Sequence, residues 1–408
     1  MNKLNQLPVS VIIPVFNNVK SLKRVLDELC NQTYKPKQIV IIDSSDVDDI
    51  NEVLVNFDDD IEIVHKKVKK AYPGRARNIG ASYATEDCIA FLDSKTVPSK
   101  DWLENSFKML KNYDVIFGSV SFRGVGVLEK LICASIYGEN SLESISGTLI
   151  SKNNFYKIGL FKETIRAGED VDWRGRVKKS NLSFVAPSNH TSVYTEISRN
   201  LAFHFKRSFI YQLHGALVDI QRSTKITFLS LFIIFLATLI PNWNYLVGYN
   251  NELLFIPHIL KFFLLIMALF ISYGVFSIYF LKISAKKRSA MLFLVNLTIF
   301  IWLFIVIFYW NAGVANWDSN SPYYIPHITK LYLGILLAAS IIIRGVIFPI
   351  KRGVSNDFLF PYRWVFIGLI GLTLDISKAP GYFCGAIIVT LRAVKLFLRP
   401  SKKIKDNV

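Results

Sequence analysis

The order of apolar and polar residues divides this chain of 408 residues into two regions. Up to about residue 222, short apolar runs alternate with charged ones, as they do in soluble domains. From Ile226 onward, long runs of Phe, Ile and Leu dominate, which is typical of membrane segments. We therefore expect a domain over residues 1–222, followed by a transmembrane and interfacial helical region over residues 223–408.

The pattern in the first region predicts an α/β domain. Residues 9–14 form an apolar run that predicts a buried strand, and residues 22–29 then place apolar side chains at helical spacing. Residues 38–42 predict a second strand, and residues 74–102 read as a helix followed by a further strand. Because a strand, a helix and a second strand in this order form a parallel βαβ unit, we expect a Rossmann-like sheet.

Carboxylates follow the predicted strands at positions that suit ligand binding. Asp43 ends the second predicted strand, and Asp93 ends the apolar run of the strand predicted within residues 74–102. Glu169 and Asp170 lie farther along the same region. Open α/β sheets bind ligands at the carboxyl ends of their strands, where Asp43 can accept hydrogen bonds from a base or a ribose. Acidic side chains at two places on one nucleotide-binding scaffold, Asp93 and the Glu169-Asp170 pair, indicate an enzyme that transfers a chemical group.

Two arginines open the helix that follows Gly74. The planar guanidinium of Arg77 can bridge phosphate oxygens in a way that a lysine cannot, and a helix N-terminus favours anions. The alternative is that Arg75 and Arg77 are solvated charges at a helix start.

Charge and cysteine content exclude some classes of protein. The net charge is +17, but basic clusters such as residues 282–288 flank apolar segments, and this arrangement attracts anionic lipid headgroups. We therefore expect membrane lipids as partners and no nucleic acid. The four cysteines form no C-x-x-C pair, so neither a zinc site nor a disulfide framework is indicated.

The second region predicts four membrane spans, at residues 226–240, 259–281, 290–310 and 331–350. The last contains Arg344, which would cost about 3 kcal/mol at a bilayer centre but lies toward the segment's end, where it can reach the interface. Basic loops after the second and fourth spans place both termini in the cytosol, which agrees with an N-terminus that lacks the apolar core of a signal peptide. Residues 364–376 and 382–398 are expected to be interfacial helices.

Five short motifs in the first region follow one another in a recognisable order: residues 11–17 (VIIPVFN), 41–43 (IID), 76–80 (ARNIG), 91–93 (FLD) and 168–170 (GED). This series resembles the family 2 glycosyltransferases, and the resemblance covers residues 9 to about 200. It implies an α/β nucleotide-diphospho-sugar-binding fold.

The resemblance also implies roles for single residues. Asp170 would be the base that accepts the proton of the acceptor hydroxyl in a one-step, inverting displacement, and Glu169 would raise the proton affinity of the pair. The alternative is a surface acidic cluster. Gly147 would line the acceptor pocket, where Trp173 offers a ring face for a sugar. The nucleotide-sugar donor would be bound by Pro14, Asn17, Asp43, Arg75, Arg77, Asn78, Asp93 and Lys95.

One position departs from the family pattern. Most members carry Asp-x-Asp where this chain has Asp93-Ser94-Lys95, and the second Asp binds Mg²⁺ or Mn²⁺. We expect Lys95 to replace part of the metal's charge, so that no metal is required. The alternative is an exposed Lys95 in a domain whose Mg²⁺ or Mn²⁺ binds through Asp93 and His190.

The combined pattern predicts a multi-pass protein of the inner (cytoplasmic) membrane with a cytosolic catalytic domain. It would transfer a sugar from a nucleotide diphosphate to a lipid-linked or envelope glycan acceptor. Because the Gln-x-x-Arg-Trp motif of processive polymerases is absent, we expect the addition of a single sugar. The alternative is a non-catalytic scaffold of an envelope polysaccharide assembly complex. The sequence does not identify the sugar, the nucleotide, the acceptor or the oligomeric state.

Overall fold

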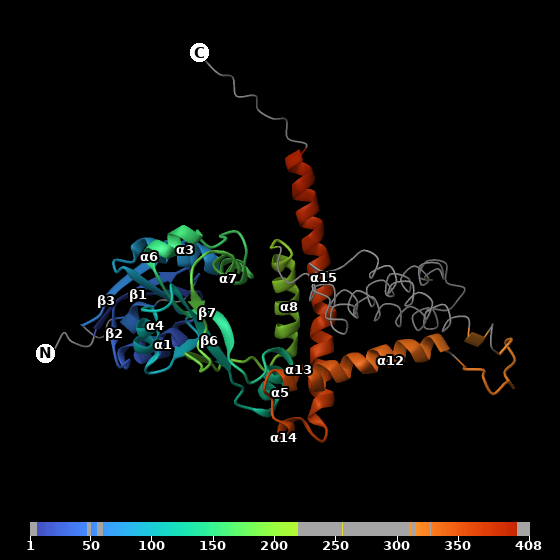
Figure 1. The fold of residues 1–408 in the computed structure, drawn as a ribbon. Coiled ribbons are helices and arrows are strands. Elements are labelled where there is room, and N and C mark those ends of the chain that lie inside the picture. The colour runs from blue at the N-terminus through green and yellow to red at the C-terminus, as the bar shows by residue number, and fades with distance from the viewer. Residues whose placement is uncertain are drawn as a thin grey trace, which may run out of the picture. The chain divides into compact units, whose positions relative to one another are not determined.

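The computed structural model describes residues 6–46, 50–54, 60–218, 255, 310–311, 315–326 and 328–397 (Figure 1). The chain forms two compact units, one of residues 1–203 and 349–360, the other of residues 204–348 and 361–408. Helix α8 (Leu201–Gly215) belongs almost wholly to the second unit. The domain boundary expected near residue 222 stays a prediction.

The first unit is built on a sheet of nine strands among the described residues. These are β1 (Gln6–Val15), β2 (Lys35–Asp43), β3 (Glu62–Lys67), β4 (Cys88–Phe91), β5 (Thr96–Pro98), β6 (Val115–Phe122), β7 (Leu142–Ser151), β8 (Phe184–Val185) and β9 (Ser192–Tyr194). Their order is β3-β2-β1-β4-β7-β6-β9-β5, with β8 beside β6. The first four run parallel, and β7 runs antiparallel to both β4 and β6.

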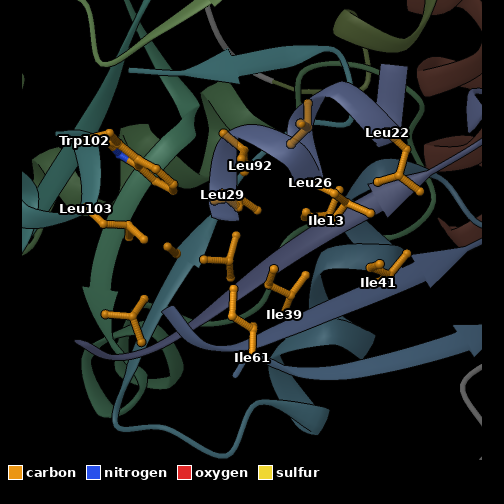
Figure 2. Packing of buried hydrophobic residues seen from close by; sticks show 14 of the residues in the cluster. Ile13, Leu22, Leu26, Leu29, Ile39, Ile41, Ile61, Leu92, Trp102 and Leu103 are labelled. Carbon is orange, nitrogen blue, oxygen red and sulfur yellow. The ribbon is translucent and has the colours of Figure 1, made fainter. Parts of the chain in front are cut away.

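Helices cover both faces of the sheet (Figure 1). The helices in the N-terminal part of this unit are α1 (Val19–Cys30), α2 (Asn51–Leu54), α3 (Pro73–Tyr83), α4 (Trp102–Met109), α5 (Val127–Ile136), α6 (Lys152–Ile158) and α7 (Glu169–Lys179). Helices α1 and α4 pack on one face, whose core Figure 2 shows, and α3, α6 and α7 pack on the other. Because successive strand residues point to opposite faces, Ile13 and Ile41 enter the first core while Ile12 and Ile42 enter the second.

This architecture confirms the predicted α/β domain and its parallel βαβ opening. The predicted strands and the helix between them correspond to β1, α1 and β2. Since β1, β2 and β4 are parallel, their carboxyl ends meet at one edge of the sheet. Asn17, Asp43 and Asp93 all lie at or just beyond these ends, as the sequence pattern predicts.

A segment distant in sequence completes the first unit. Residues 349–360 include most of α13 (Phe348–Lys351) and all of α14 (Asn356–Leu359). Arg352 Nη1 donates to the carbonyl oxygens of Ile136 at 2.8 Å and Tyr137 at 3.2 Å, at the end of α5. A Cβ atom on Gly138, which has a φ of +80°, would lie 2.3 Å from Arg352 Cβ. The glycine therefore allows the segment to pack at this point.

The described part of the second unit is mostly helical, apart from turns in residues 315–326. It contains α12 (Ile328–Ile342), the π-helical turn η2 (Ile343–Ile347) and α15 (Arg363–Phe397), together with most of α8. Ser377, Gly381 and Gly385 lie one helical turn apart on α15 against α8, where a Cβ on Gly381 would be 2.3 Å from the carbonyl oxygen of Phe209. Such small residues allow two helix backbones to approach closely.

Two expectations for this unit need correction. The predicted span at residues 331–350 is not one uninterrupted α-helix: a π-helical turn follows α12, and there Gly345 lies close to the carbonyl of Trp364. The two helices expected at residues 364–376 and 382–398 are one helix, α15, which continues through Pro380.

The remaining predicted spans, residues 226–240, 259–281 and 290–310, lie almost entirely outside the described residues. Within the part of the chain that the structure describes, no helix has both the length and the apolar character needed to cross a membrane.

Candidate active site

Arg77 joins two carboxylates near the carboxyl edge of the sheet. Its Nη2 donates to Asp93 Oδ1 at 2.7 Å and its Nη1 donates to Glu169 Oε1 at 2.9 Å. The side chains of Arg77 and Glu169 are 4% and 6% exposed, whereas that of Asp93 is 41% exposed. The guanidinium of Arg77 thus connects helix α3 with the turn after β4 and with the first turn of α7.

Two glycines allow this close arrangement. A Cβ atom on Gly74, in the first turn of α3, would lie 2.5 Å from the carbonyl oxygen of Lys162 and 3.2 Å from Glu169 Cγ. Gly168 precedes α7 with a φ of +90°, a conformation that favours glycine. The sequence therefore places glycine where α3 and α7 approach each other.

Asn78 holds the segment between α6 and α7. Its side chain accepts a hydrogen bond from the backbone N–H of Phe161 at 2.9 Å and donates to that residue's carbonyl at 3.0 Å. It also donates to Glu163 Oε1 at 2.9 Å. Because Asn78 is buried and its amide is engaged within the protein, its observed contacts are structural, and the predicted donor contact stays a prediction.

The first turn of α7 carries three carboxylates, each with a cation partner. Glu169 is paired with Arg77, and Asp172 lies 2.9 Å from Lys162 Nζ. Asp170 makes the weakest contact, since its Oδ2 lies 3.5 Å from Arg174 Nη2 and its side chain is 30% exposed. Glu169 lies on the buried face of the helix, and Asp170 follows about 100° around it. Asp170 is therefore the most accessible acid of the three.

Burial sets the acidity of Glu169. It raises the pKa of this carboxyl to about 6, since the loss of hydration outweighs the attraction of Arg77, and the charge of Asp170 raises the pKa further. Although burial lowers the pKa of Arg77, Asp93 and Glu169 hold it above its ordinary value. The raised proton affinity predicted for the Glu169–Asp170 pair is thus found at Glu169.

Asp43 marks another part of the same edge. Its fully buried carboxylate lies 2.8 Å from Lys67 Nζ and accepts a hydrogen bond from the backbone N–H of Ser45 at 2.9 Å. Burial alone would raise the pKa of Asp43, but the hydrogen bonds from Lys67 and Ser45 hold it below its ordinary value. Asn17, with a φ of +48°, donates its N–H to Ser45 Oγ at 2.8 Å, so the ends of β1 and β2 are tied together.

Lys95 has an ion-pair partner that the sequence did not indicate. Its Nζ lies 3.5 Å from Glu196 Oε2, and the other oxygen of Glu196 accepts a hydrogen bond from Ser21 Oγ in α1. The Lys95 side chain remains 44% exposed. Glu196 follows β9 and belongs to none of the five motifs, so only the fold brings it to Lys95.

The residues at this edge do not fit a divalent cation held by two acids. Asp93 Oδ1 is paired with Arg77, and Lys95 places an ammonium where a second carboxylate would be needed. His190 is exposed, and among the described residues no group of three or more His, Cys, Asp and Glu side chains is arranged to hold a metal ion.

The two residues predicted to bind the acceptor differ in their surroundings. Gly147 is buried in β7 with a φ of +90°, and its carbonyl accepts a hydrogen bond from Trp102 Nε1 at 3.0 Å. Trp173 has no exposed surface and packs against Phe91 and Phe161 in the second core, so its ring cannot stack on a sugar. Trp173 and Val177 are one turn apart on α7, and this apolar spacing is a signal of burial.

The remaining predicted residues lie at the surface or partly buried. Pro14 is half-buried in β1, and Arg75 is exposed one residue after Gly74. Ser146, next to Gly147 in β7, contacts the donor side of the site, because its Oγ accepts a hydrogen bond from the N–H of Asp93 at 2.9 Å. Ser146 therefore helps to place the Asp93 carboxylate.

Comparison with known proteins identifies similar sequences for part of this unit. Residues 10–161 match the family model described as Glycosyl transferase family 2. This range includes β1, β2, α3 and Asp93, and it ends before Glu169 and Asp170. Residues 10–161 of the first unit are thus similar to the family 2 glycosyltransferases.

Curated relatives are similar over the same region. An uncharacterized glycosyltransferase of Rickettsia conorii is 31% identical over 41% of this chain and 29% of its own length. The pre-mycofactocin glycosyltransferase of Mycobacterium tuberculosis is 26% identical over 47% of this chain and 45% of its own, and glycosyltransferase AglE of Haloferax volcanii is 29% identical over 43% and 62%. The chain spans less than two thirds of the length of each of these relatives.

Among solved structures, S. aureus TarS (residues 1–349) in complex with UDP-GlcNAc covers 52% of this chain and 68% of its own, with 17% identity and a TM-score of 0.37.

Proposed function

We propose that this protein is an inverting glycosyltransferase that moves a sugar from a nucleotide diphosphate donor to an acceptor presented at a membrane. The observation that carries the proposal is the accessible Asp170 beside the buried Arg77–Glu169 pair, within a unit that matches a glycosyltransferase family. The curated relatives named as glycosyltransferases support the same reaction class.

In the proposed reaction, the acceptor hydroxyl attacks the anomeric carbon of the donor sugar. Its proton passes to Asp170, the bond between the anomeric carbon and the phosphate oxygen breaks, and the nucleoside diphosphate leaves. One displacement inverts the anomeric centre. In this proposal Asn17 and Asp43 contact the base and the ribose, and the exposed Arg75 and Lys95 offer positive charge to the diphosphate. The buried Asp43 carboxylate is already held by Lys67 and Ser45, so its contact with the donor would replace one of these bonds.

We further propose that the donor diphosphate is handled without a required metal. The support is the charge at the turn after β4, where the ammonium of Lys95 stands two residues beyond Asp93 and Asp93 is paired with Arg77. A metal held there would meet a positive charge and lack a second carboxylate.

Membrane attachment is also a proposal. Its support is the apolar pattern of residues 226–310 and the surface of the second unit. Large apolar side chains are exposed along α12 and α15: Leu331, Ile335, Ile342, Phe366, Leu369, Phe383, Ile387 and Leu391. Surface of this kind is stable when it contacts lipid. The second unit would hold the active site at the cytosolic surface of the inner membrane, close to a lipid-linked or glycan acceptor.

A donor screen tests the activity. The full chain in native membranes is incubated with UDP-glucose, UDP-N-acetylglucosamine, GDP-mannose and dTDP-rhamnose, with membrane extract as acceptor. We expect one donor to give release of nucleoside diphosphate that depends on the extract. No release from any donor would instead support the non-catalytic scaffold.

Reporter fusions test the membrane arrangement. Fusions after Lys287 and after Asn320 should report opposite sides of the membrane, because the predicted span at residues 290–310 lies between them. Both reporters on one side would contradict the proposed topology.

A further inference from the structure

We infer that Arg77 is a positioning residue that couples the donor side of the active site to its base side by holding Asp93 and Glu169 at one guanidinium. This inference rests on the proposed glycosyltransferase reaction. It assigns Arg77 a role different from the phosphate contact that its sequence position suggests.

The contacts of Arg77 leave it little freedom to bind a ligand directly. Its side chain is 4% exposed, and both terminal nitrogens already donate to carboxylates. Its guanidinium carbon lies 5.6 Å from the centre of the Phe161 ring, and Nε is buried without a hydrogen-bond partner among the described residues. A phosphate could reach this group only if one carboxylate moved away.

The two carboxylates paired with Arg77 have different environments, so Arg77 links two different parts of the active site. Asp93 is 41% exposed at the turn that carries Lys95, so it faces the donor side. Glu169 is 6% exposed and begins the helical turn that presents Asp170. A planar guanidinium can hold both carboxylates at fixed angles, whereas an ammonium cannot. A displacement of α3 or β4 would therefore be transmitted to the base through Arg77.

Geometry alone predicts how loss of this coupling should appear. If Arg77 only positions the base, the substitution should lower kcat and leave the donor KM nearly unchanged, because substrate binding does not use Arg77. A misplacement of about 1 Å can cost about 100-fold in rate. If Arg77 instead binds the diphosphate, the donor KM should rise.

Arg77→Lys is the direct test, because it keeps the positive charge but removes the fork. With the full chain in native membranes and the most active donor of the screen, we expect kcat to fall by about 10- to 100-fold. We expect the donor KM to change by less than about threefold. The acid limb of the kcat profile should move to higher pH by about one unit, since a loosened cation stabilises ionised Glu169 less well.

Arg176→Lys is the matched control on α7. Arg176 is also multiply bonded, with Nε 3.2 Å from Asp172 Oδ2, Nη1 2.8 Å from the carbonyl of Ile158 and Nη2 2.8 Å from that of Leu160. Its bonds hold the helix but do not involve Glu169. We expect this variant to lower the unfolding temperature and to leave kcat and its acid limb in place.

Gly74→Ala provides a second test if Arg77→Lys does not fold. The added Cβ would lie 2.5 Å from the carbonyl oxygen of Lys162 and 3.2 Å from Glu169 Cγ, so it would force α3 and the start of α7 apart without changing any charge. It should also lower kcat at nearly constant KM.

Several results would overturn the inference. A donor KM raised at least tenfold at unchanged kcat, in either variant, would show a phosphate-binding Arg77 and leave the proposed reaction standing. Unchanged kcat and KM in Arg77→Lys would show that no coupling exists. Absence of turnover in the wild-type protein with every donor would contradict the proposed function itself, and the two failures are thus distinguishable.

Discussion

Each unit of this protein contains an arginine–carboxylate network, and the two networks differ in the exposure of their carboxylates. In the first unit one guanidinium, Arg77, is paired with two carboxylates, and one of them, Asp93, is 41% exposed. In the second unit one carboxylate, Asp375, is fully buried and is paired with both Arg344 and Lys378. The first network has a carboxylate that is open to solvent, whereas the carboxylate of the second is closed to it.

This difference indicates what each network does. A carboxylate that is fully buried between two cations has no route to a substrate, so the Asp375 network contributes to the packing of η2 and α15. It also explains how Arg344 is accommodated in an apolar segment, because its charge is compensated. The Arg77 network leaves Asp93 accessible and lies beside Asp170, so it can contribute to chemistry.

The strongest test of this comparison is Asp170→Asn. The amide keeps the shape of the side chain but cannot accept the acceptor's proton, so kcat should fall by about 10²- to 10⁴-fold while donor binding stays nearly intact. Asp172→Asn, on the same turn, serves as the control and should retain most of the activity. Turnover of Asp170→Asn near the wild-type rate would refute Asp170 as the base.

The second test concerns the closed network. Asp375→Asn removes the fully buried carboxylate that Arg344 and Lys378 contact, and loss of one partner of a buried pair costs about 3–5 kcal/mol of stability. Thermal unfolding of the purified protein in detergent should show this loss, with the donor KM of the folded fraction unchanged. The exposed Asp357 is the control, and Asp357→Asn should unfold at the wild-type temperature. An equal loss in both variants would mean that the Asp375 network does not stabilise the second unit.

Lys95 provides a smaller test on the open side of the site. An ammonium about 4 Å from a phosphate contributes roughly 4 kcal/mol at an effective dielectric constant of 20, before its desolvation is subtracted. We expect Lys95→Ala to reduce kcat/KM by about tenfold, which is about 1.4 kcal/mol, whereas EDTA leaves the wild-type rate unchanged. Lys111→Ala, an exposed control, should have no effect. A wild-type preparation that loses activity in EDTA and recovers it with Mn²⁺ would contradict metal-independent transfer.

The smallest expected effect is a pH dependence set by Glu169. Its pKa in the folded protein is about 6, above the ordinary value of 4.5. Its protonation therefore stabilises the fold below the ordinary value, and this contribution is lost as the pH rises through about 6. The pH dependence of the activity should be opposite to that of the stability. We expect kcat to be half-maximal near pH 6 and to fall at lower pH, because protonated Glu169 lacks the negative charge with which Arg77 is paired. Glu169→Gln should remove this limb from the kcat profile. A limb that persists in this variant would assign the titration to another group.

The comparison also shows how far sequence reasoning reaches in this chain. Apart from Ser10 and Gln38, residues 9–14 and 38–42 are apolar without alternation. Strands with this pattern are buried on both faces, so β1, α1 and β2 were predictable. The motif order placed Asp43, Asp93 and Asp170 at the carboxyl edge for the same local reason, since each follows its own strand or begins its own helix. These features depend on periodicity and on neighbours in the chain.

Only the tertiary structure decided the contacts between segments that are far apart in sequence. Glu196 pairs with Lys95, Asp375 pairs with Arg344, and Arg352 donates a hydrogen bond to the end of α5. No local sequence pattern predicts any of these contacts. Arg77 illustrates the physical reason. Its helix position predicts an arginine ready for an anion, but whether that anion is a ligand or a buried carboxylate depends on which side chains the fold brings within 3 Å, and the loss of hydration there determines the charge that remains.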